Sequence, residues 1–528
     1  MQQEQREQIE GERKQRGDMK VCSAMQKTVM AKVLIIGGGV AGLAAGIYAQ
    51  KAGLNSTIYE RHSVPGGLLS WWNRKGYLLD NCVHWLTGTN PKTDIYKVWE
   101  EVGVLGKDVH VLQPESFMQV ESGGETLNVW HDIERLHADL LRISPRDKKN
   151  IEEFIGLLRI YQNVALVAHK PMEQLSVWEY AKLIWSMRKV GKMHRIYSKM
   201  SIGEYAERFH SPIIRKMLNV YFPKFYNVSS LFYVYAAFCN DNADLPQGGS
   251  KGMMERMVRR YESTGGTICT GWEAEQINIQ GGHAYSVSFS NGETVEADYI
   301  ISTCDLFHTM AHLLPIEYTD PYMQEHFIDL PKKYPTYSSV NLYFAVDHVT
   351  REVPCALALD IDNLRIDNRD VKTGFLKHFN YETSFSPEGK SVLQVLLMQY
   401  EEDYDYWERL RREDYQAYKT EKNLVAKIVQ EALEKRFSEL RGHISLLDIV
   451  TPVTNTRYCN VYKGAFMSFA LTPQNEKIYH RGRIKGVDNL YLAGQWLQAP
   501  GGLPNAVVTG KFAIQRLLKD HKELQKRP

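Results

Sequence analysis

The stretch "KVLIIGGGVAGLAAGIYAQKAGLNSTIYE", Lys32 to Glu60, decides the fold class. It opens with a short apolar run typical of a strand that is buried on both faces. Three glycines follow in the spacing G-x-G-x-x-G, namely Gly37, Gly39 and Gly42. A helix is expected after them, then a second strand over 55–59 that ends at Glu60. This order predicts an α/β fold with a Rossmann-like dinucleotide-binding domain.

The glycines and Glu60 each have a role in holding a dinucleotide. The first glycine makes the tight turn, the second lets the backbone approach a pyrophosphate, and the third lets the helix pack closely on the strand. The first helical residues, Val40 and Ala41, are expected to turn amide groups toward the phosphates. Glu60 stands where a carboxylate accepts the hydroxyls of an adenosine ribose, and it disfavours a 2′-phosphate. Arg61 is a further candidate contact.

A second glycine pair distinguishes FAD from NAD. In "ERHSVPGGLLSWW", which begins at Glu60, the pair Gly66 and Gly67 follows the ribose carboxylate, and Ser70 comes three residues later. Such a pair lets the main chain pass close to the diphosphate and the flavin side of a longer cofactor. The arrangement resembles that of the FAD-binding amine oxidase and phytoene desaturase superfamily. The resemblance implies that these residues and Leu68 bind FAD.

The C-terminal segment "NLYLAGQWLQAPGGLPNAVV" agrees with that resemblance. It predicts a strand over 490–492, a turn at Gly494 and a helix that starts near Leu503 and Pro504. In the superfamily this segment closes over the ribityl chain and the flavin ring, which implies contacts from Gly494, Gln495, Leu503, Pro504 and Ala506. Many members have an acid where this chain has Gln495. Its absence favours the phytoene desaturase, carotenoid isomerase and retinol saturase branch over the amine oxidases.

Two middle segments extend the resemblance. "GYLLDNCVHWLTG", 76–88, resembles a stretch that the family places beside the flavin, although Cys82 replaces a usual glycine. His84 in it is a weak catalytic candidate as a proton donor, and a structural hydrogen-bonding role is the alternative. The segment 245–277 resembles one in which backbone near Ala274 meets the adenine. The sequence has no second G-x-G-x-x-G after a strand, so an electron donor or acceptor such as NAD(P)H, a quinone or oxygen is expected to visit transiently.

The region 105–240 is expected to define the substrate and to be helical. The stretch 177–200 predicts one basic amphipathic helix with Trp178 and Trp185, which fits contact with a membrane surface or a solvated face of a packed helix. The run 221–238 holds eight aromatic residues in eighteen. It predicts the wall of a tunnel for a long apolar chain, a buried core helix, or both.

Composition excludes several other classes. The net charge of +2 over 528 residues gives no sign of nucleic-acid binding. Seven scattered cysteines without a C-x-x-C pair favour reduced thiols in the cytoplasm. No apolar run is long enough to span a bilayer, and 1–30 predicts a flexible polar tail. No metal site is expected: His308 and His312 are four residues apart, but the glutamate of H-E-x-x-H is absent.

The expected architecture has two units. The resemblance implies a discontinuous FAD-binding domain from 31–104, 241–305 and 485–528, and an α+β substrate domain of mixed sheet and helices from 105–240 and 306–484. The hypothesis is an FAD-dependent oxidoreductase that desaturates, saturates or isomerises C–C double bonds of an apolar, isoprenoid or carotenoid-like substrate. An amine oxidase-like enzyme with Trp496 in an aromatic cage, or a non-catalytic flavin-binding protein, is the alternative. The expected location is cytoplasmic, with peripheral contact to the inner face of a membrane.

Overall fold

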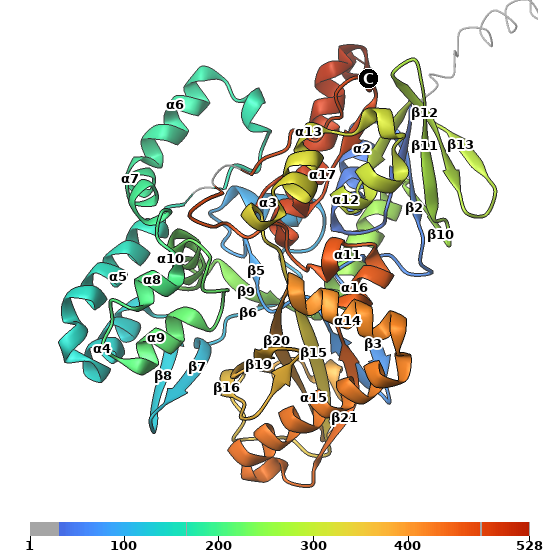
Figure 1. Ribbon diagram of the computed structural model, residues 1–528. Coiled ribbons are helices and arrows are strands. Elements are labelled where there is room, and N and C mark those ends of the chain that lie inside the picture. Colours follow the sequence, from blue (N-terminus) through green and yellow to red (C-terminus); the bar gives the residue numbers. More distant parts are fainter. Residues whose placement is uncertain (1–30, 165, 476–477, 527–528) are drawn as a thin grey trace, which may run out of the picture.

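A computed structural model describes residues 31–164, 166–475 and 478–526. Two sheets stand one above the other, and a helical lobe lies beside both (Figure 1). The parallel sheet is built from the N-terminal and C-terminal parts of the chain, and the larger sheet is built mainly from the region 337–450. The tail 1–30, for which flexibility is predicted, lies outside the described residues.

The first sheet is parallel throughout and has five strands. Its order is β10 (Thr267–Thr270), β2 (Asn55–Glu60), β1 (Lys32–Ile36), β14 (Tyr299–Ser302) and β22 (Leu490–Leu492). Its strands come from 31–104, 241–305 and 485–528. The chain runs outward from β1 in both directions, which creates a switch point between β1 and β14 at the carboxyl ends of the strands.

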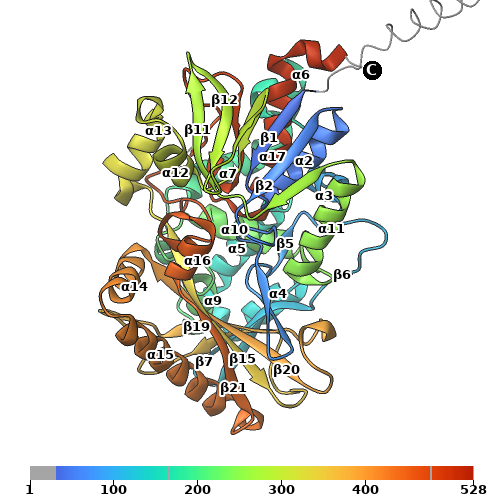
Figure 2. The ribbon, with the colours of Figure 1, turned by 90° about the vertical axis from the view of Figure 1, so that its right-hand side faces the viewer.

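Helices cover one face of the parallel sheet, and a small antiparallel sheet covers the other (Figure 2). The helical layer contains α2 (Val40–Lys51), α3 (Asp94–Glu101), α11 (Gly249–Ser263) and α17 (Gly502–Asp520). The small sheet contains β11 (Ala274–Gln280), β12 (His283–Phe289) and β13 (Thr294–Glu296). Beside it lie the short helices α12 (Leu306–His308) and α13 (Pro321–Met323). Both faces of β1 are therefore buried, as its unbroken apolar sequence predicts.

The second large sheet has seven strands and is mixed. Its order is β21 (Ile444–Val450), β15 (Tyr337–Val346), β20 (Ser391–Tyr400), β19 (Thr373–His378), β16 (Ala356–Asp360), β7 (Ser116–Ser122) and β8 (Glu125–Trp130). One face carries α14 (Glu401–Glu413) and α15 (Tyr415–Arg436), whose Trp407, Val425 and Leu433 are buried against it. Its opposite face packs on β4 and on the helical lobe and also forms the wall of a site. The neighbouring helix α16 is Pro452–Cys459.

Short strands join the two units. These are β3 (Trp71–Arg74) with β4 (Tyr77–Asp80), and β5 (Leu86–Thr87) and β6 (Val111–Leu112) on either side of β9 (Ala243–Pro246). A further pair, β17 (Arg365–Ile366) and β18 (Arg369–Asp370), forms a separate two-stranded ribbon.

The region 105–240 is not wholly helical, which corrects one prediction. It begins with β6 and with the hairpin β7–β8, which extends the seven-stranded sheet. The hairpin turns at Gly123 and Gly124, both with positive φ, and a two-residue glycine turn of this kind matches the twist of paired strands. The remainder is the helical lobe, with α4 (Ile133–Ile143), α5 (Lys148–Tyr161), α6 (Val177–Ser186), α7 (Arg188–Tyr197), α8 (Ile202–Ala206), α9 (Pro212–Asn219) and α10 (Val228–Phe238).

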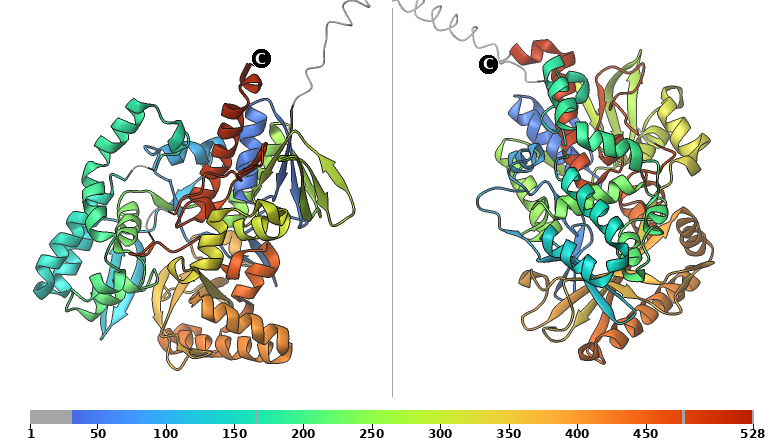
Figure 3. Two further views of the ribbon diagram at one scale, coloured as in Figure 1. Left: turned by 45° about the horizontal axis from the view of Figure 1, so that its top comes forward. Right: turned by 90° about the vertical axis from the view of Figure 1, so that its left-hand side faces the viewer.

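The single helix predicted over 177–200 is also two helices. The backbone leaves the helical conformation at Met187, between α6 and α7. The break lets Val190 of α7 become buried in the helical lobe, whereas α6 contains no buried residue. Figure 3 shows α6 and α7 along the outer side of the lobe. Across the described residues, no helix is both long enough and apolar enough to pass through a bilayer.

Candidate functional site

A cavity of about 780 Å³ lies where the parallel sheet, the seven-stranded sheet and the helical lobe meet. Most of the predicted site residues line it: Gly37, Gly39, Val40, Ala41, Glu60, Arg61, Gly66, Gly67, Leu68, His84, Ala274, Gly494, Gln495, Leu503, Pro504 and Ala506. They come from both ends of the chain and from its middle. Gly42 and Ser70 are not among the lining residues.

The two glycine turns pack directly on each other. The Gly66 amide donates to the Gly38 carbonyl oxygen at 3.0 Å, and Gly39 forms an isolated parallel bridge with Gly66. Gly67 has a φ of +56°, and a Cβ there would lie 3.5 Å from the Gly39 Cα. Side chains at Gly39 and Gly67 would therefore fill the space between the turns, where glycine leaves exposed backbone at the cavity.

Gly42 has a packing role beneath the turn. A Cβ at this position would come 2.0 Å from the carbonyl oxygen of Gly37, so α2 can approach the turn only because Gly42 has no side chain. This agrees with the role assigned to the third glycine of the motif, although the residue does not face the cavity.

Glu60 is fixed at the end of β2. Its side chain is buried, with Oε2 accepting from the Gly38 amide at 2.7 Å and Oε1 accepting from the His62 amide at 2.9 Å. Each carboxylate oxygen keeps a further lone pair for an additional donor. The neighbouring Arg61 forms an ion pair with Glu273, at 3.4 Å between Nη1 and Oε1, and both residues line the cavity.

The C-terminal turn is held by α17. Thr509 Oγ1 accepts from the Gly494 amide at 2.9 Å. The Gln495 side chain accepts from the Gly502 amide at 2.9 Å through Oε1. The amide group of Gln495 therefore organises the start of α17 in addition to lining the cavity.

Ser70 supports a neighbouring loop instead of lining the cavity. Its carbonyl oxygen accepts from the Asn81 amide at 3.1 Å, and its Oγ accepts from Asn81 Nδ2 at 3.3 Å. Asn81 does line the cavity and begins the loop that carries His84. The pairing extends the β3–β4 hairpin by one residue on each strand, since Trp71 pairs with Asp80.

The wall opposite the glycine turns is mostly apolar. The seven-stranded sheet contributes alternate residues, which point to one face: Tyr337, Ser339 and Asn341 of β15, Thr373 and Phe375 of β19, and Leu396 and Met398 of β20. The helical lobe adds aromatic rings from the predicted aromatic run, among them Tyr221, Phe222, Tyr226 and Tyr233. The run 221–238 is therefore both core and cavity wall, since α10 buries Phe232 and Tyr235.

Carboxylates are absent from this wall. Among the described residues that line the cavity from 161–234, 337–398 and 466–471, none is Asp or Glu. The lining carboxylates Glu60, Glu273 and Asp305 come from segments beside the parallel sheet. Tyrosine hydroxyls of the wall are partly paired within it, as in the 3.0 Å hydrogen bond from Tyr226 to Tyr337. The wall therefore suits an apolar ligand better than a cationic one.

Residues 40–518 match the flavin-containing amine oxidoreductase family. The chain belongs to this family. The flavin-containing oxidoreductase is 21 % identical to a prolycopene isomerase of Daucus carota, over 94 % of this chain and 81 % of that protein. It is 21 % identical to a lycopene-forming phytoene desaturase of a Paracoccus species (92 % and 97 %) and 22 % identical to an all-trans-retinol 13,14-reductase of Danio rerio (92 % and 86 %).

A solved structure has the same fold. It is an oxidoreductase from Methanosarcina mazei, 16 % identical, with a TM-score of 0.56 over 92 % of this chain and all of that one. The protein is an FAD-dependent oxidoreductase with an α/β fold.

Two helix starts fit the anionic part of FAD. The N-caps of α2 and α17 are Gly39 and Gly501, and neither helix has a side-chain cap, whereas α6, α8 and α10 are capped by Ser176, Ser201 and Asn227. The residues after both glycine caps line the cavity. The first amides of α2 and the positive end of each helix dipole therefore face the cavity, an environment that favours a diphosphate, whereas in α17 the Gly502 amide already donates to Gln495 and Pro504 has no N–H.

His84 is neutral in the flavin-containing oxidoreductase. Burial, and then the positive charge of Lys377, lowers the pKa of His84 to about 3. Its Nδ1 lies 3.3 Å from the Cys82 carbonyl oxygen, Gln394 lies near the ring, and the buried Nε2 makes no hydrogen bond of normal geometry. A neutral imidazole that donates from Nδ1 has an acceptor lone pair at Nε2. The environment of His84 therefore disfavours proton donation from Nε2.

A buried lysine and aspartate hold the His84 loop. Asp80 Oδ1 accepts from the amides of Cys82 and Val83 at 3.0 and 3.1 Å, and Oδ2 accepts from the Ser250 amide at 2.7 Å. Lys377 Nζ donates to the Val83 carbonyl oxygen at 2.6 Å. Burial lowers the pKa of Lys377 to about 8, although the charge of Asp80 opposes this. Asp80 and Lys377 therefore fix the backbone conformation of the loop that carries His84.

Sequence analysis missed two cavity residues at the end of β14. Thr303 Oγ1 donates to the carbonyl oxygens of Ile36 and Gly37, and so joins β14 to the glycine turn. Asp305 accepts from the His308 and Tyr462 amides, and burial raises its pKa to about 6. Their position in the sequence could have indicated them. Both follow a buried strand, and ligands bind at the carboxyl edge of a parallel sheet.

The remaining histidines do not form a centre in the cavity. His308 lines it, with Nε2 3.3 Å from Asn460 Nδ2, and burial lowers the pKa of His308 to about 4. The described residues contain one other cluster with metal-ligand atoms, Asp347, His348 and His443, and none of these lines the cavity. Trp496 lines the cavity and packs on Phe327, Phe469 and Tyr462.

Proposed function

We propose that this FAD-dependent oxidoreductase desaturates, saturates or isomerises carbon–carbon double bonds of an apolar, isoprenoid or carotenoid-like substrate. The observation that carries the proposal is the substrate wall, in which alternate strand residues and aromatic rings present no carboxylate to the cavity. The curated relatives support it, because they are named for an isomerase, a desaturase and a reductase of polyene compounds. The same wall would leave an ammonium group without a partner.

We also propose which segments of the chain bind FAD and which bind the substrate. The segments 31–104, 241–305 and 485–528 form the FAD-binding unit, and 105–240 with 306–484 form the substrate-binding unit. The starts of α2 and α17 hold the diphosphate, while Glu60 accepts hydroxyls of the adenosine ribose. Backbone near Ala274, together with Arg61, borders the adenine end.

Bound FAD supplies hydride exchange at its ring, and the protein positions the reacting carbon and excludes water. The apolar wall formed by Phe375, Leu396 and Met398 excludes water. Neutral His84 and Asn81 are the polar groups of the loop that borders the cavity, and we assign them hydrogen bonding and loop structure. Saturation also takes up a proton and desaturation releases one, and the low pKa of His84 makes it a poor donor for the first.

We further propose that the enzyme works in peripheral contact with a membrane surface, because apolar isoprenoids partition into bilayers. The exposed Trp178 and Trp185 support this contact. The electron partner, whether NAD(P)H, a quinone or oxygen, is a transient visitor in this proposal.

The test compares two substrate classes with purified holoenzyme. Polyenes of increasing length and aliphatic amines are each mixed anaerobically with the enzyme, while flavin absorbance and product mass are followed. A polyene product that differs by two hydrogens, or an isomer of equal mass, with inert amines, supports the proposal. Oxidation of amines alone favours the amine oxidase alternative, and a flavin that no donor, acceptor or substrate alters favours a non-catalytic flavin-binding protein.

A further inference from the structure

Helix α6 turns large apolar side chains toward solvent. Val177, Trp178 and Trp185 are 84 %, 85 % and 66 % exposed, and Tyr180 and Ile184 are exposed as well. No residue of the helix is buried. In Figure 1 the helix lies at the outer edge of the helical lobe, away from both large sheets. In a soluble protein, large apolar residues of a helix normally pack against the core. The exposed apolar face of α6 therefore indicates a binding partner outside this chain's core.

The exposed apolar residues form one continuous stripe. Val177, Ala181, Ile184 and Trp185 are spaced i, i+4, i+7 and i+8, which places them on one side of a helix. Trp178 precedes Trp185 by seven residues and so widens the same side. The polar residues Glu179, Lys182 and Ser186 lie around the opposite side. The stripe is therefore an amphipathic face with its apolar half outward.

Positive charge surrounds this stripe. Six cations follow in the next twenty residues: Lys182, Arg188, Lys189, Lys192, Arg195 and Lys199. No Asp or Glu occurs between Glu179 and Glu204. Glu179 itself is paired with Lys170 at 2.8 Å. Aromatic residues beside a cluster of unopposed cations are complementary to an anionic lipid surface, where rings enter the interface and cations meet the headgroups.

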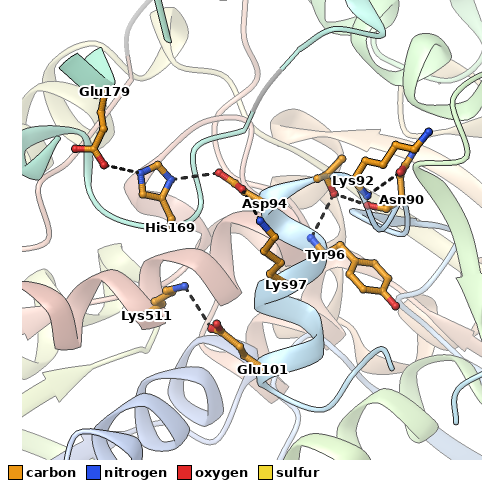
Figure 4. A network of polar contacts seen from close by, with 10 residues as sticks. Asn90, Lys92, Asp94, Tyr96, Lys97, Glu101, His169, Glu179 and Lys511 are labelled. Atoms are coloured by element: carbon orange, nitrogen blue, oxygen red, sulfur yellow. Dashed lines mark hydrogen bonds and ion pairs between the residues drawn. The ribbon is translucent and has the colours of Figure 1, made fainter. Parts of the chain in front are cut away.

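The helix is held in place by polar contacts at its start. Ser176 and Glu179 form a capping box. His169 joins Glu179, at 3.5 Å, to Asp94 of α3, at 3.2 Å, and so ties α6 to the helical layer of the parallel sheet (Figure 4). The apolar stripe is thus presented by an anchored element.

The next helix connects this surface to the cavity. Met187, Val190, Gly191 and His194, from the break and from α7, line the cavity opposite the glycine turns. One continuous segment therefore carries the exposed stripe and part of the cavity wall. An apolar molecule that leaves a bilayer beside α6 would meet α7 next.

We propose that the α6–α7 segment, Val177–Tyr197, docks on a bilayer that contains anionic lipids, with the stripe of α6 in the interface and the cations of α7 on the headgroups. Docking places the α7 side of the cavity at the membrane, from which an apolar substrate enters. The docking rests on the membrane contact of the proposed function and adds its surface and the lipid charge, and the entry route rests on the apolar substrate.

Vesicle co-flotation of the holoenzyme tests the docking. We expect binding to phosphatidylcholine vesicles that contain phosphatidylglycerol, and weaker binding to phosphatidylcholine alone. The double variant Trp178→Ala/Trp185→Ala should lower the partition coefficient at least about tenfold. The double variant Lys189→Glu/Lys192→Glu should lower it more than about tenfold on anionic vesicles, since each cation near such a surface contributes about fivefold.

Matched variants control for general changes of the surface. Ile316→Ala/Tyr285→Ala removes exposed apolar residues elsewhere, and Lys332→Glu/Lys427→Glu reverses exposed cations elsewhere; both should bind vesicles like the wild type. Flavin absorbance and the thermal midpoint report that each variant is folded and loaded. A colourless protein that still floats would defeat the proposed FAD-dependent reaction and leave docking standing.

Three results would overturn the docking. One is a wild-type holoenzyme that fails to float with either vesicle. Another is flotation that the tryptophan and lysine variants leave unchanged. The last is light scattering that shows a dimer in the wild type and a monomer in Trp178→Ala/Trp185→Ala, without flotation, because the stripe would then bind a second copy of the chain.

Discussion

Gly510 of α17 lies directly against Ala41 of α2: a Cβ atom at Gly510 would come 2.4 Å from the Ala41 carbonyl oxygen. The contact joins two helices that are more than 450 residues apart in the chain, and the starts of both line the cavity. The two ends of the protein therefore meet around the site through backbone that has no room for a side chain.

Substitution Gly510→Ala should separate α17 from α2. The added methyl group would also approach Ala44 Cβ at 2.9 Å, so the helices must shift. We expect a loss of about 1–3 kcal/mol in the free energy of unfolding, as overpacking usually causes, and a weaker hold on FAD. Thermal unfolding and flavin release on dilution measure the two effects. Gly156→Ala in α5 is the control, because a Cβ there meets nothing within 4 Å and should stabilise the protein slightly.

Replacement of Glu60 by Gln should weaken FAD binding. The carboxylate accepts from the Gly38 amide, and the proposal adds hydroxyls of the ribose. Hydrogen bonds to a charged group contribute about 1.5–3 kcal/mol, so the dissociation constant of FAD should rise about tenfold to a hundredfold. Fluorescence titration of the apoprotein with FAD measures it. Glu275→Gln, an exposed change on β11, should bind FAD like the wild type, and equal affinity in both variants would contradict the role of Glu60.

The glycine turns were predictable because their requirement is local. Gly37 has a φ of +100° and Gly67 has a φ of +56°. Few residues other than glycine adopt these conformations, so a glycine in the sequence indicates the turn directly. The strands around them follow from unbroken apolar runs such as residues 33–36. The α/β fold and FAD could therefore be inferred from the sequence alone.

Other features depended on contacts that no local pattern carries. Ser70 meets Asn81 at the end of the β3–β4 hairpin, and Gln495 accepts from the Gly502 amide across the turn before α17. The break at Met187 likewise follows from packing, since α7 buries Val190 while α6 buries nothing. The Gly123–Gly124 turn was a local signal that could have revealed the β7–β8 hairpin.

Protonation of His84 should destabilise the fold in acid. Its pKa is about 3 in the folded protein and about 6.5 when unfolded, so the unfolded state binds more protons between these values and stability rises with pH across that window. His84→Gln removes this contribution. The difference in unfolding free energy between wild type and variant should therefore grow from about pH 5 to about pH 7 in urea titrations. A difference that stays constant would show that His84 is not buried in neutral form.

Loss of the Lys377 charge should affect both stability and the His84 loop. Lys377→Met removes the donor to the Val83 carbonyl oxygen and the positive charge near Asp80. A buried carbonyl oxygen that loses its donor typically costs about 1–3 kcal/mol, which urea unfolding at neutral pH would detect. Lys372→Met, an exposed change just before β19, is the control and should have little effect.

The effect of Lys377→Met should also depend on pH in a definite direction. The folded pKa of about 8 lies below the value of about 10.5 in the unfolded chain, so the unfolded state holds more protons between them. Wild-type stability should therefore rise, relative to Lys377→Met, as pH increases through that window. Unfolding titrations of the two proteins at several alkaline pH values give this comparison. The unfolding free energy of the wild type minus that of Lys377→Met is the quantity compared. If it falls as pH rises, the fold stabilises the charged form of Lys377, and Asp80 outweighs burial in setting the pKa of Lys377.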